Sequence, residues 1–170
     1  MEENFSQFSD NLKLTSNQRE DAKKKYEGVC ECLDKHYYDS EYNENHKLLF
    51  GSYKTRTNIR PIIPEQDVDV LFKISEELYN SYKNNPERLL QDMRSALKQK
   101  YATTDKISAW GKVILIQFSD GTHNVEVLPA IENNDSTFLI PNTESGGSWE
   151  YIDPRSQINS SSFASDKSRV

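Results

Sequence analysis

A short run of alternating acidic and apolar residues, QDVDVLFKI at 66–74, constrains the fold of this chain most strongly. Its period of two predicts a β-strand over 67–74. Asp67 and Asp69 then share one face of a sheet, with Cα atoms roughly 6.6 Å apart. The opposite face is apolar and consists of Val68, Val70, Phe72 and Ile74. Whether the two aspartates only face water, or serve a site, depends on what the rest of the chain places beside them.

The chain as a whole has the composition of one folded domain. Its 170 residues can bury a core, and 35% hydrophobic with 28% charged residues is typical of a polar globular protein. No segment approaches the ~20 apolar residues that span a bilayer. The N-terminus MEENFSQFSDNLK lacks the basic and apolar regions of a signal peptide. We therefore expect a soluble, cytoplasmic protein that makes no membrane contact.

The net charge and the positions of the cysteines disfavour broad DNA binding, a disulfide and a metal site. A net charge of -6 disfavours broad DNA binding, which needs a basic surface, although a local basic patch could still hold a nucleoside triphosphate. Cys30 and Cys32 lie two apart on a predicted helix, so they point in different directions and disfavour a disulfide or a metal clip. Cys32 and His36 share a helix face, but two ligands do not make a zinc site, and a reduced thiol is the favoured interpretation.

Two amphipathic helices are predicted from capping residues and apolar spacing. Thr15 or Ser16 caps the first, which covers about 16 to 38 and has the stripe Ala22, Tyr26, Val29, Leu33 and Tyr37. Asn85 caps the second, which opens at Pro86 and has the stripe Leu89, Leu90, Met93, Leu97 and Tyr101. Acidic residues interleave with the basic residues of the first helix, which indicates a solvated, salt-bridged face.

The two ends of the chain are less regular. Residues 1–14 carry apolar residues at uneven spacing, and we expect them to pack on the domain as an arm. After Pro129 the chain becomes polar, and Trp149 and Tyr151 are the last plausible anchors. The stretch QINSSSFASDKSRV has too few apolar residues to pack alone and is expected to be a surface tail or the start of a further segment.

Residues 112–128 predict a β-hairpin that contains a third acid. A two-residue type I′ turn at Asp120-Gly121 would pair Leu115 with Glu126. Glu126 then shares a face with the apolar residues Val113, Leu115 and Leu128. A carboxylate among apolar neighbours is costly unless its charge is compensated. Glu126 is therefore either at an exposed edge or bound to a cation.

A predicted strand over 47–50 ends at Gly51-Ser52, and this turn has the character of a phosphate site. Glycine lets backbone N–H groups approach an oxyanion, and the Ser52 hydroxyl adds a donor. A helix that starts near Tyr53 would direct its N-terminal dipole at the same anion. Lys54, Arg56 and Arg60 lie close enough in sequence to help neutralise phosphates, but they are equally consistent with exposed basic residues on a loop and are not assigned to the site. Tyr53 and Trp149 could stack a base, but aromatic packing is the favoured interpretation.

The three acids together suit divalent metal ions. Two Mg²⁺ ions about 3.5–4 Å apart need bridging carboxylates, because hard cations prefer oxygen ligands. Asp67 and Asp69 converge from one strand, and Glu126 can join them from a neighbouring strand. Each motif alone is weak. Their order favours a two-metal site: a strand with Gly-Ser comes first, then a strand with Asp-x-Asp, then a hairpin with a third acid. Mn²⁺ is an alternative to Mg²⁺ at such a site.

The runs GSYKTRTNIRP, QDVDVLFKI, HNVEVLPAI and SGGSWEYIDP carry a family resemblance. They resemble the nucleotidyltransferases of the DNA polymerase β-like superfamily, and within it the bacterial second-messenger synthases related to cyclic GMP-AMP synthase and oligoadenylate synthetase. The resemblance implies an α+β core over 1–154, with a mixed or antiparallel sheet flanked by helices and a long N-terminal helix. It also implies a helical second lobe, of which residues 155–170, a polar tail, would be the start.

The resemblance also assigns roles to residues. Gly51 and Ser52 would contact the triphosphate of ATP, GTP or another nucleotide. Asp67 and Asp69 would hold both Mg²⁺ ions, with Glu126 in place of the usual third aspartate. The implied product is a cyclic di- or trinucleotide that activates an effector in anti-phage defence. Two alternatives stay open: a nucleotidyltransferase that modifies a protein or tRNA, and a lobe that binds nucleotide or a partner without catalysis.

Overall fold

The computed structural model describes residues 2–55, 66–102 and 106–153, except for the side chains of residues 2–5, 52 and 55. Seven strands form the sheet: β1 Lys47–Phe50, β2 Asp67–Lys73, β3 Lys106–Trp110, β4 Val113–Gln117, β5 Asn124–Glu132, β6 Phe138–Asn142 and β7 Ser148–Ile152. The helices are α1 Glu2–Leu12, α2 Ser16–Tyr38, α3 Gly51–Thr55, α4 Glu76–Tyr82 and α5 Pro86–Lys100. Two short 3-10 turns are η1 Glu44–His46 and η2 Glu144–Gly146. The predicted α+β class is confirmed.

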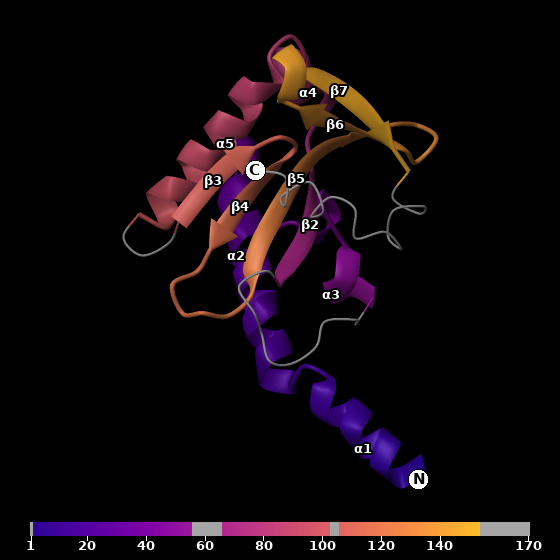
Figure 1. Cartoon of the computed structure of the whole chain (residues 1–170). Helices are drawn as coiled ribbons and strands as arrows, with labels where there is room; N and C mark the ends of the chain where they lie inside the picture. The colour runs from indigo at the N-terminus through magenta and orange to yellow at the C-terminus, as the bar shows by residue number, and fades with distance from the viewer. Residues whose placement is uncertain (1, 56–65, 103–105, 154–170) are drawn as a thin grey trace.

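The sheet is mixed, as predicted. Its strand order is β1-β2-β5-β4-β3, and the hairpin β6–β7 continues from the far end of β5. The pair β2–β5 is parallel, whereas β1–β2, β4–β5 and β3–β4 are antiparallel. The acid-bearing strands β2 and β5 therefore lie side by side at the centre of the sheet (Figure 1).

Each face of the sheet is covered by different elements. On one face α2 and α5 pack against the alternate apolar residues of β2, β4 and β5, and together they form the larger core. On the other face a smaller core joins β1, β2 and β5 to the hairpin β6–β7; its members are Phe50, Leu71, Leu128, Ala130, Phe138, Ile140 and Ile152. The second face is thus apolar toward one end of the strands and carries the acids toward the other.

The two long helices begin where the sequence predicts. Thr15 caps α2 through a capping box, in which its side chain accepts from Gln18 N and the Gln18 side chain accepts from Thr15 N. Asn85 caps α5 by accepting from Arg88 N, and Pro86 occupies the first turn. Lys23 and Lys24 of α2 are exposed and pair with Glu27 and Glu20 one turn away, as expected for a solvated face. Lys25 also pairs along the helix, with Asp21, but its side chain is only 10% exposed, so the expectation is wrong for this residue.

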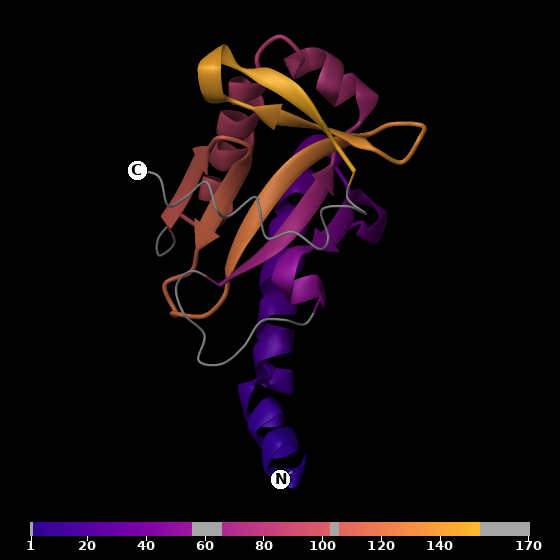
Figure 2. The same ribbon diagram turned by 45° about the vertical axis from the view of Figure 1, so that its right-hand side comes forward.

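The expectation that residues 1–14 pack on the domain is wrong for most of the segment. Residues Glu2–Leu12 form the helix α1, which extends away from the sheet in both views (Figures 1 and 2). Phe8 is 61% exposed, and only Leu14 of the described side chains in this segment is buried. Uneven apolar spacing cannot distinguish a packed arm from a projecting helix, because it does not define a contact face. Within the described ranges, no helix has the length and apolar character needed to cross a membrane.

The predicted register of the β4–β5 hairpin is confirmed, but its two-residue turn is wrong. Leu115 pairs with Glu126, while the strands separate after Gln117 and leave residues 118–123 as a longer loop. Asp120 does not adopt the positive φ that a type I′ turn requires. Its carboxylate instead accepts from Thr122 N at 3.0 Å and pairs at 2.7 Å with Lys25 of α2, whose side chain is 10% exposed.

The polar segment after Pro129 contains more regular structure than its composition indicates. Strand β5 continues through Pro129 to Glu132, and β6 and β7 follow as a hairpin. Trp149 is an anchor, since its ring packs edge-on against Tyr79 at 4.7 Å and its Nε1 donates to Lys83 O. Tyr151 is not, because it is 75% exposed. The predicted tail at 155–170 lies outside the described residues.

Candidate active site

The parallel pairing of β2 with β5 brings the three acids together on one face. Asp69 is the direct partner of Glu126, and Asp67 is the partner of Asn124. Directly opposed residues on neighbouring strands point to the same side of a sheet, and the strands are about 4.8 Å apart. Asp67, Asp69 and Glu126 therefore share the face that is not covered by α2 and α5. Their role as metal ligands stays a prediction.

Glu126 lies in the interior of the sheet. It is 1% exposed and sits on β5 between Asp69 of β2 and Leu115 of β4. The alternative of an exposed edge is therefore wrong, because β5 has a strand on either side. A carboxylate placed there next to a second carboxylate needs compensating charge or hydrogen bonds. A cation as the compensating partner remains the prediction.

The backbone at Gly51 lies in close contact with the Asp69 side chain. Phe50, the last residue of β1, pairs with Asp69, and the chain then turns at Gly51 with a φ of +68°. A Cβ at position 51 would lie 2.0 Å from Asp69 Oδ2 and 2.9 Å from its Cγ. Only glycine both adopts this φ without strain and leaves space for the carboxylate. The turn thus positions an acid in addition to any phosphate.

Helix α3 begins at Gly51, two residues earlier than the expected start near Tyr53. Tyr53 holds the helix against α2: its Oη donates to Arg19 O at 3.0 Å, and its ring packs edge-on against Tyr26 at 6.1 Å. Packing therefore accounts for Tyr53, as expected. The side chain of Ser52 lies outside the part of the chain that the structure describes, so its contact with phosphate stays a prediction. Arg56 and Arg60 also lie outside the described part, whereas Lys54 is exposed.

Two polar residues at the start of β5 were missed by sequence reasoning. Asn124 is 5% exposed, and its Nδ2 donates to Asp67 Oδ1 at 3.2 Å. His123 is fully buried with its ring edge-on to Tyr53, and neither ring nitrogen has a hydrogen-bond partner. Burial, reinforced by the charge of Lys25, lowers the pKa of His123. The alternation of side chains that placed Glu126 on one face of the strand also places Asn124 on that face. This alternation could have identified Asn124 from the sequence.

The donor set fits a hard divalent cation in its chemistry, although the side chains do not form a closed ligand set. Three carboxylates on one face of two adjacent strands offer the oxygen ligands that Mg²⁺ and Mn²⁺ prefer. Among residues 2–55, 66–102 and 106–153, no three His, Cys, Asp or Glu side chains are gathered closely enough to hold a metal ion.

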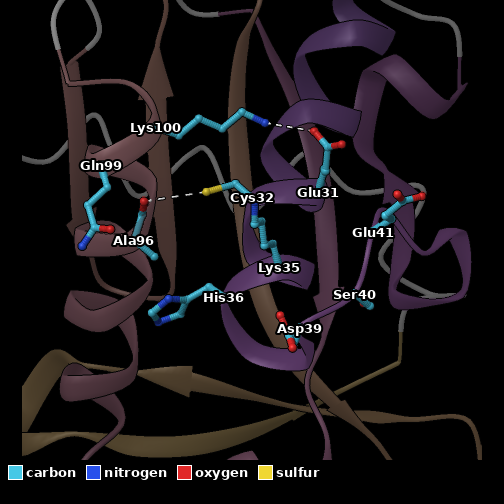
Figure 3. A pocket seen from close by; sticks show the side chains of 10 residues that line it. All are labelled: Glu31, Cys32, Lys35, His36, Asp39, Ser40, Glu41, Ala96, Gln99 and Lys100. Carbon is cyan, nitrogen blue, oxygen red and sulfur yellow. Dashed lines mark hydrogen bonds and ion pairs between the residues drawn. The ribbon is translucent and has the colours of Figure 1, made fainter.

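A cavity of about 850 Å³ lies on the other side of the sheet from the acids, between α2 and α5 (Figure 3). Its lining is mixed in charge, with Glu31 bound to Lys100 across the opening at 3.1 Å. The Cys32 thiol donates to Ala96 O, and burial raises the pKa of Cys32. A zinc site at Cys32 and His36 is therefore not supported, and the cysteine is a protonated, packed thiol.

A mixed sheet with helices on one face, and two adjacent acid-bearing strands beside the Gly51 turn, has the arrangement expected for a nucleotidyltransferase core. The chain belongs to the Second Messenger Oligonucleotide or Dinucleotide Synthetase domain family, whose model matches residues 1–163. A search of curated proteins finds no match.

Solved structures with the same fold are distant in sequence. The CD-NTase CdnG of Bradyrhizobium diazoefficiens, in complex with GTP, is 16% identical with a TM-score of 0.62, over 87% of this chain and 42% of that one. The cyclic AMP-GMP synthase DncV of Vibrio cholerae, with a linear intermediate bound, is 13% identical with a TM-score of 0.62, over 87% and 57%. The CdnE cyclic dinucleotide synthase of Elizabethkingia meningoseptica is 18% identical with a TM-score of 0.52, over 77% and 47%. The chain thus spans about half the length of these proteins.

Proposed function

We propose that the chain is the catalytic lobe of a metal-dependent nucleotidyltransferase that joins nucleoside triphosphates into a cyclic di- or trinucleotide. The observation that carries the proposal is the register of β2 and β5, in which Asp69 faces Glu126 beside Asp67. No structural requirement of the fold explains three acids on this face, since like charges directly opposed on neighbouring strands destabilise a sheet. Membership of the synthetase family supports the same conclusion.

The proposal gives each residue of the site a role. Asp67 and Asp69 would hold two Mg²⁺ or Mn²⁺ ions, and Glu126 would contribute to one of them. When bound, such ions neutralise the triphosphate and favour attack by a 3′-hydroxyl. The new bond joins this oxygen to the α-phosphorus, and the bond to the β-phosphate bridging oxygen breaks as pyrophosphate leaves. Gly51 opens the turn at the start of α3, where Ser52 and backbone N–H groups would bind phosphate oxygens.

The substrates and the biological setting are part of the proposal. ATP and GTP are the proposed nucleotides, supported by structures of the same fold in complex with GTP. The proposed product acts on a separate effector in anti-phage defence, and the proposed location is the cytoplasm, where nucleoside triphosphates are abundant. Glu126 is one methylene longer than the usual aspartate, so either the metal geometry would adjust or the second metal would bind less tightly than in the related synthases.

The test is synthesis from labelled nucleotides. The 170-residue chain is incubated with each nucleoside triphosphate and each pair of them, in Mg²⁺ or Mn²⁺, and the products are treated with phosphatase. A cyclic product has no terminal phosphate, so it resists the enzyme. We expect such a product from the wild-type chain and none from Asp69→Asn. A folded chain that yields no resistant product with any pair contradicts the proposal.

The same experiment separates the two alternatives. Transfer of label to protein or tRNA, without a small product, would identify a macromolecule-modifying enzyme. Tight nucleotide binding that does not depend on Mg²⁺, measured by calorimetry, would identify a non-catalytic lobe. The second alternative draws on the observation that, among the described residues, the acids do not form a closed ligand set.

A further inference from the structure

We infer that Asn124 is a positioning residue that orients the Asp67 carboxylate for metal binding. The inference rests on the proposed function. It adds a residue to the site that touches neither the metal nor the nucleotide and acts through Asp67. The side chain amide of Asn124 donates from Nδ2 to Asp67 Oδ1 at 3.2 Å.

The backbone fixes the two residues relative to each other. They are direct partners in the parallel ladder of β2 and β5. The ladder continues past them, because Asn124 N also donates to the carbonyl of Gln66 at 3.3 Å. Asn124 is 5% exposed, whereas Asp67 is half-buried. A buried, well-anchored donor therefore holds one oxygen of a carboxylate that reaches solvent.

The chemistry of an amide suits this position. Residues 124 and 126 lie two apart on β5, and their partners 67 and 69 lie two apart on β2, so the four side chains form a block on one face. Three of its members are acids. A fourth acid opposite Asp67 would add a like charge at the closest cross-strand distance. Asparagine instead supplies a neutral N–H donor, which adds no charge to the block and limits the rotation of the Asp67 carboxylate through a hydrogen bond.

Partners that hydrogen-bond to metal ligands commonly determine how well those ligands bind. Loss of such a partner typically costs about 10–100-fold in metal affinity or activity. A purely structural role for Asn124 would instead predict lower stability with unchanged metal affinity. The two roles therefore differ in a property that can be measured without turnover.

The experiment titrates the chain with Mn²⁺ alone and measures free Mn²⁺ by electron paramagnetic resonance. Asn124→Leu keeps the branched shape of the side chain and removes the donor, and Asn124→Ala is the second variant in case the larger leucine prevents folding. Asn142→Leu is the matched control, since Asn142 Nδ2 also donates to a carboxylate, Glu150 Oε1, at 2.6 Å on the hairpin β6–β7. Asp67→Asn reports the loss of the ligand itself.

We expect both Asn124 variants to bind Mn²⁺ about 10–100-fold more weakly than the wild type. Asn142→Leu should bind like the wild type at a comparable loss of thermal stability. In nucleotidyl transfer, the Mn²⁺ concentration for half-maximal rate should rise for the Asn124 variants, while the rate at saturating Mn²⁺ recovers. This recovery would not follow from a structural defect.

Two outcomes overturn the inference in distinguishable ways. If Asp67→Asn loses Mn²⁺ and the Asn124 variants bind it like the wild type, Asn124 has no positioning role, while the proposed function stands. If the wild type and Asp67→Asn bind Mn²⁺ equally or not at all, the metal site is not at Asp67. The proposed function and this inference then fail together.

Discussion

Replacement of Gly51 by alanine tests whether the Gly-Ser turn positions an acid as well as a phosphate. The added Cβ would lie 2.0 Å from Asp69 Oδ2, and ordinary contact begins at 3.4 Å, so the oxygen must retreat by about 1.4 Å. Alanine at a φ of +68° also costs about 1–2 kcal/mol of backbone strain. A misplacement of about 1 Å in a catalytic group can cost about 100-fold in rate. We expect a loss of nucleotidyl transfer of that size.

The backbone strain alone predicts a fall in melting temperature of about 2–8 °C for a chain of this length. Gly121→Ala is the matched control, because Gly121 has a φ of +71° and a Cβ there would meet nothing within 4 Å. Both variants should lose stability, and only Gly51→Ala should lose activity and Mn²⁺ affinity. The assays are thermal denaturation, Mn²⁺ titration and product formation. If Gly51→Ala retains wild-type Mn²⁺ affinity and activity, the turn does not position Asp69.

Three further predictions concern the buried acid, the buried histidine and the α2 cap. Glu126→Gln should lower nucleotidyl transfer by about 100-fold or more. It should also raise the free energy of unfolding by up to about 1 kcal/mol, since it removes a like charge opposite Asp69. A loss of stability in denaturant titration would contradict this second expectation. Because the folded pKa of His123 is lowered, the unfolded chain takes up the proton first as pH falls. Stability is therefore complete above about pH 6.5 and declines below it, by up to about 1.4 kcal/mol per pH unit, and His123→Phe should remove this slope in pH-dependent denaturation. Thr15→Ala should lower the free energy of unfolding by about 1 kcal/mol, because the capping box with Gln18 is lost. This corresponds to a melting temperature lower by about 2–4 °C. An unchanged melting temperature would show that the cap does not stabilise the protein.

Local sequence signals predicted the elements that form the centre of the fold. The strand over 47–50 and the helices from Ser16 and Pro86 occur where capping residues and apolar spacing placed them. The pairing of Leu115 with Glu126 was also predicted, although the turn that suggested it has a different length. The register was correct because a one-residue slip would have moved every apolar side chain of the hairpin to the wrong face.

Features that depend on distant contacts could not be predicted in the same way. The loop at 118–123 contains Asp120, which pairs with Lys25 of α2, a contact between residues 95 positions apart. The hairpin β6–β7 lies in a segment whose composition is typical of loops, and it is ordered by packing on Leu128 and Ala130. Helix α1 projects from the sheet with Phe8 61% exposed, and the uneven apolar spacing of residues 1–14 does not specify a contact face.

By itself, the sequence determined which side chains alternate on each strand, and so which acids could share a face. Only the tertiary structure decided that β2 and β5 run parallel and adjacent, so that Asp69 meets Glu126 and Asp67 meets Asn124. The physical reason is the sequence separation of the interacting residues. Side-chain alternation and helix capping depend on residues that are only a few positions apart. The pairing of strands separated by about 50 residues is instead selected by the core that α2 and α5 form on the opposite face.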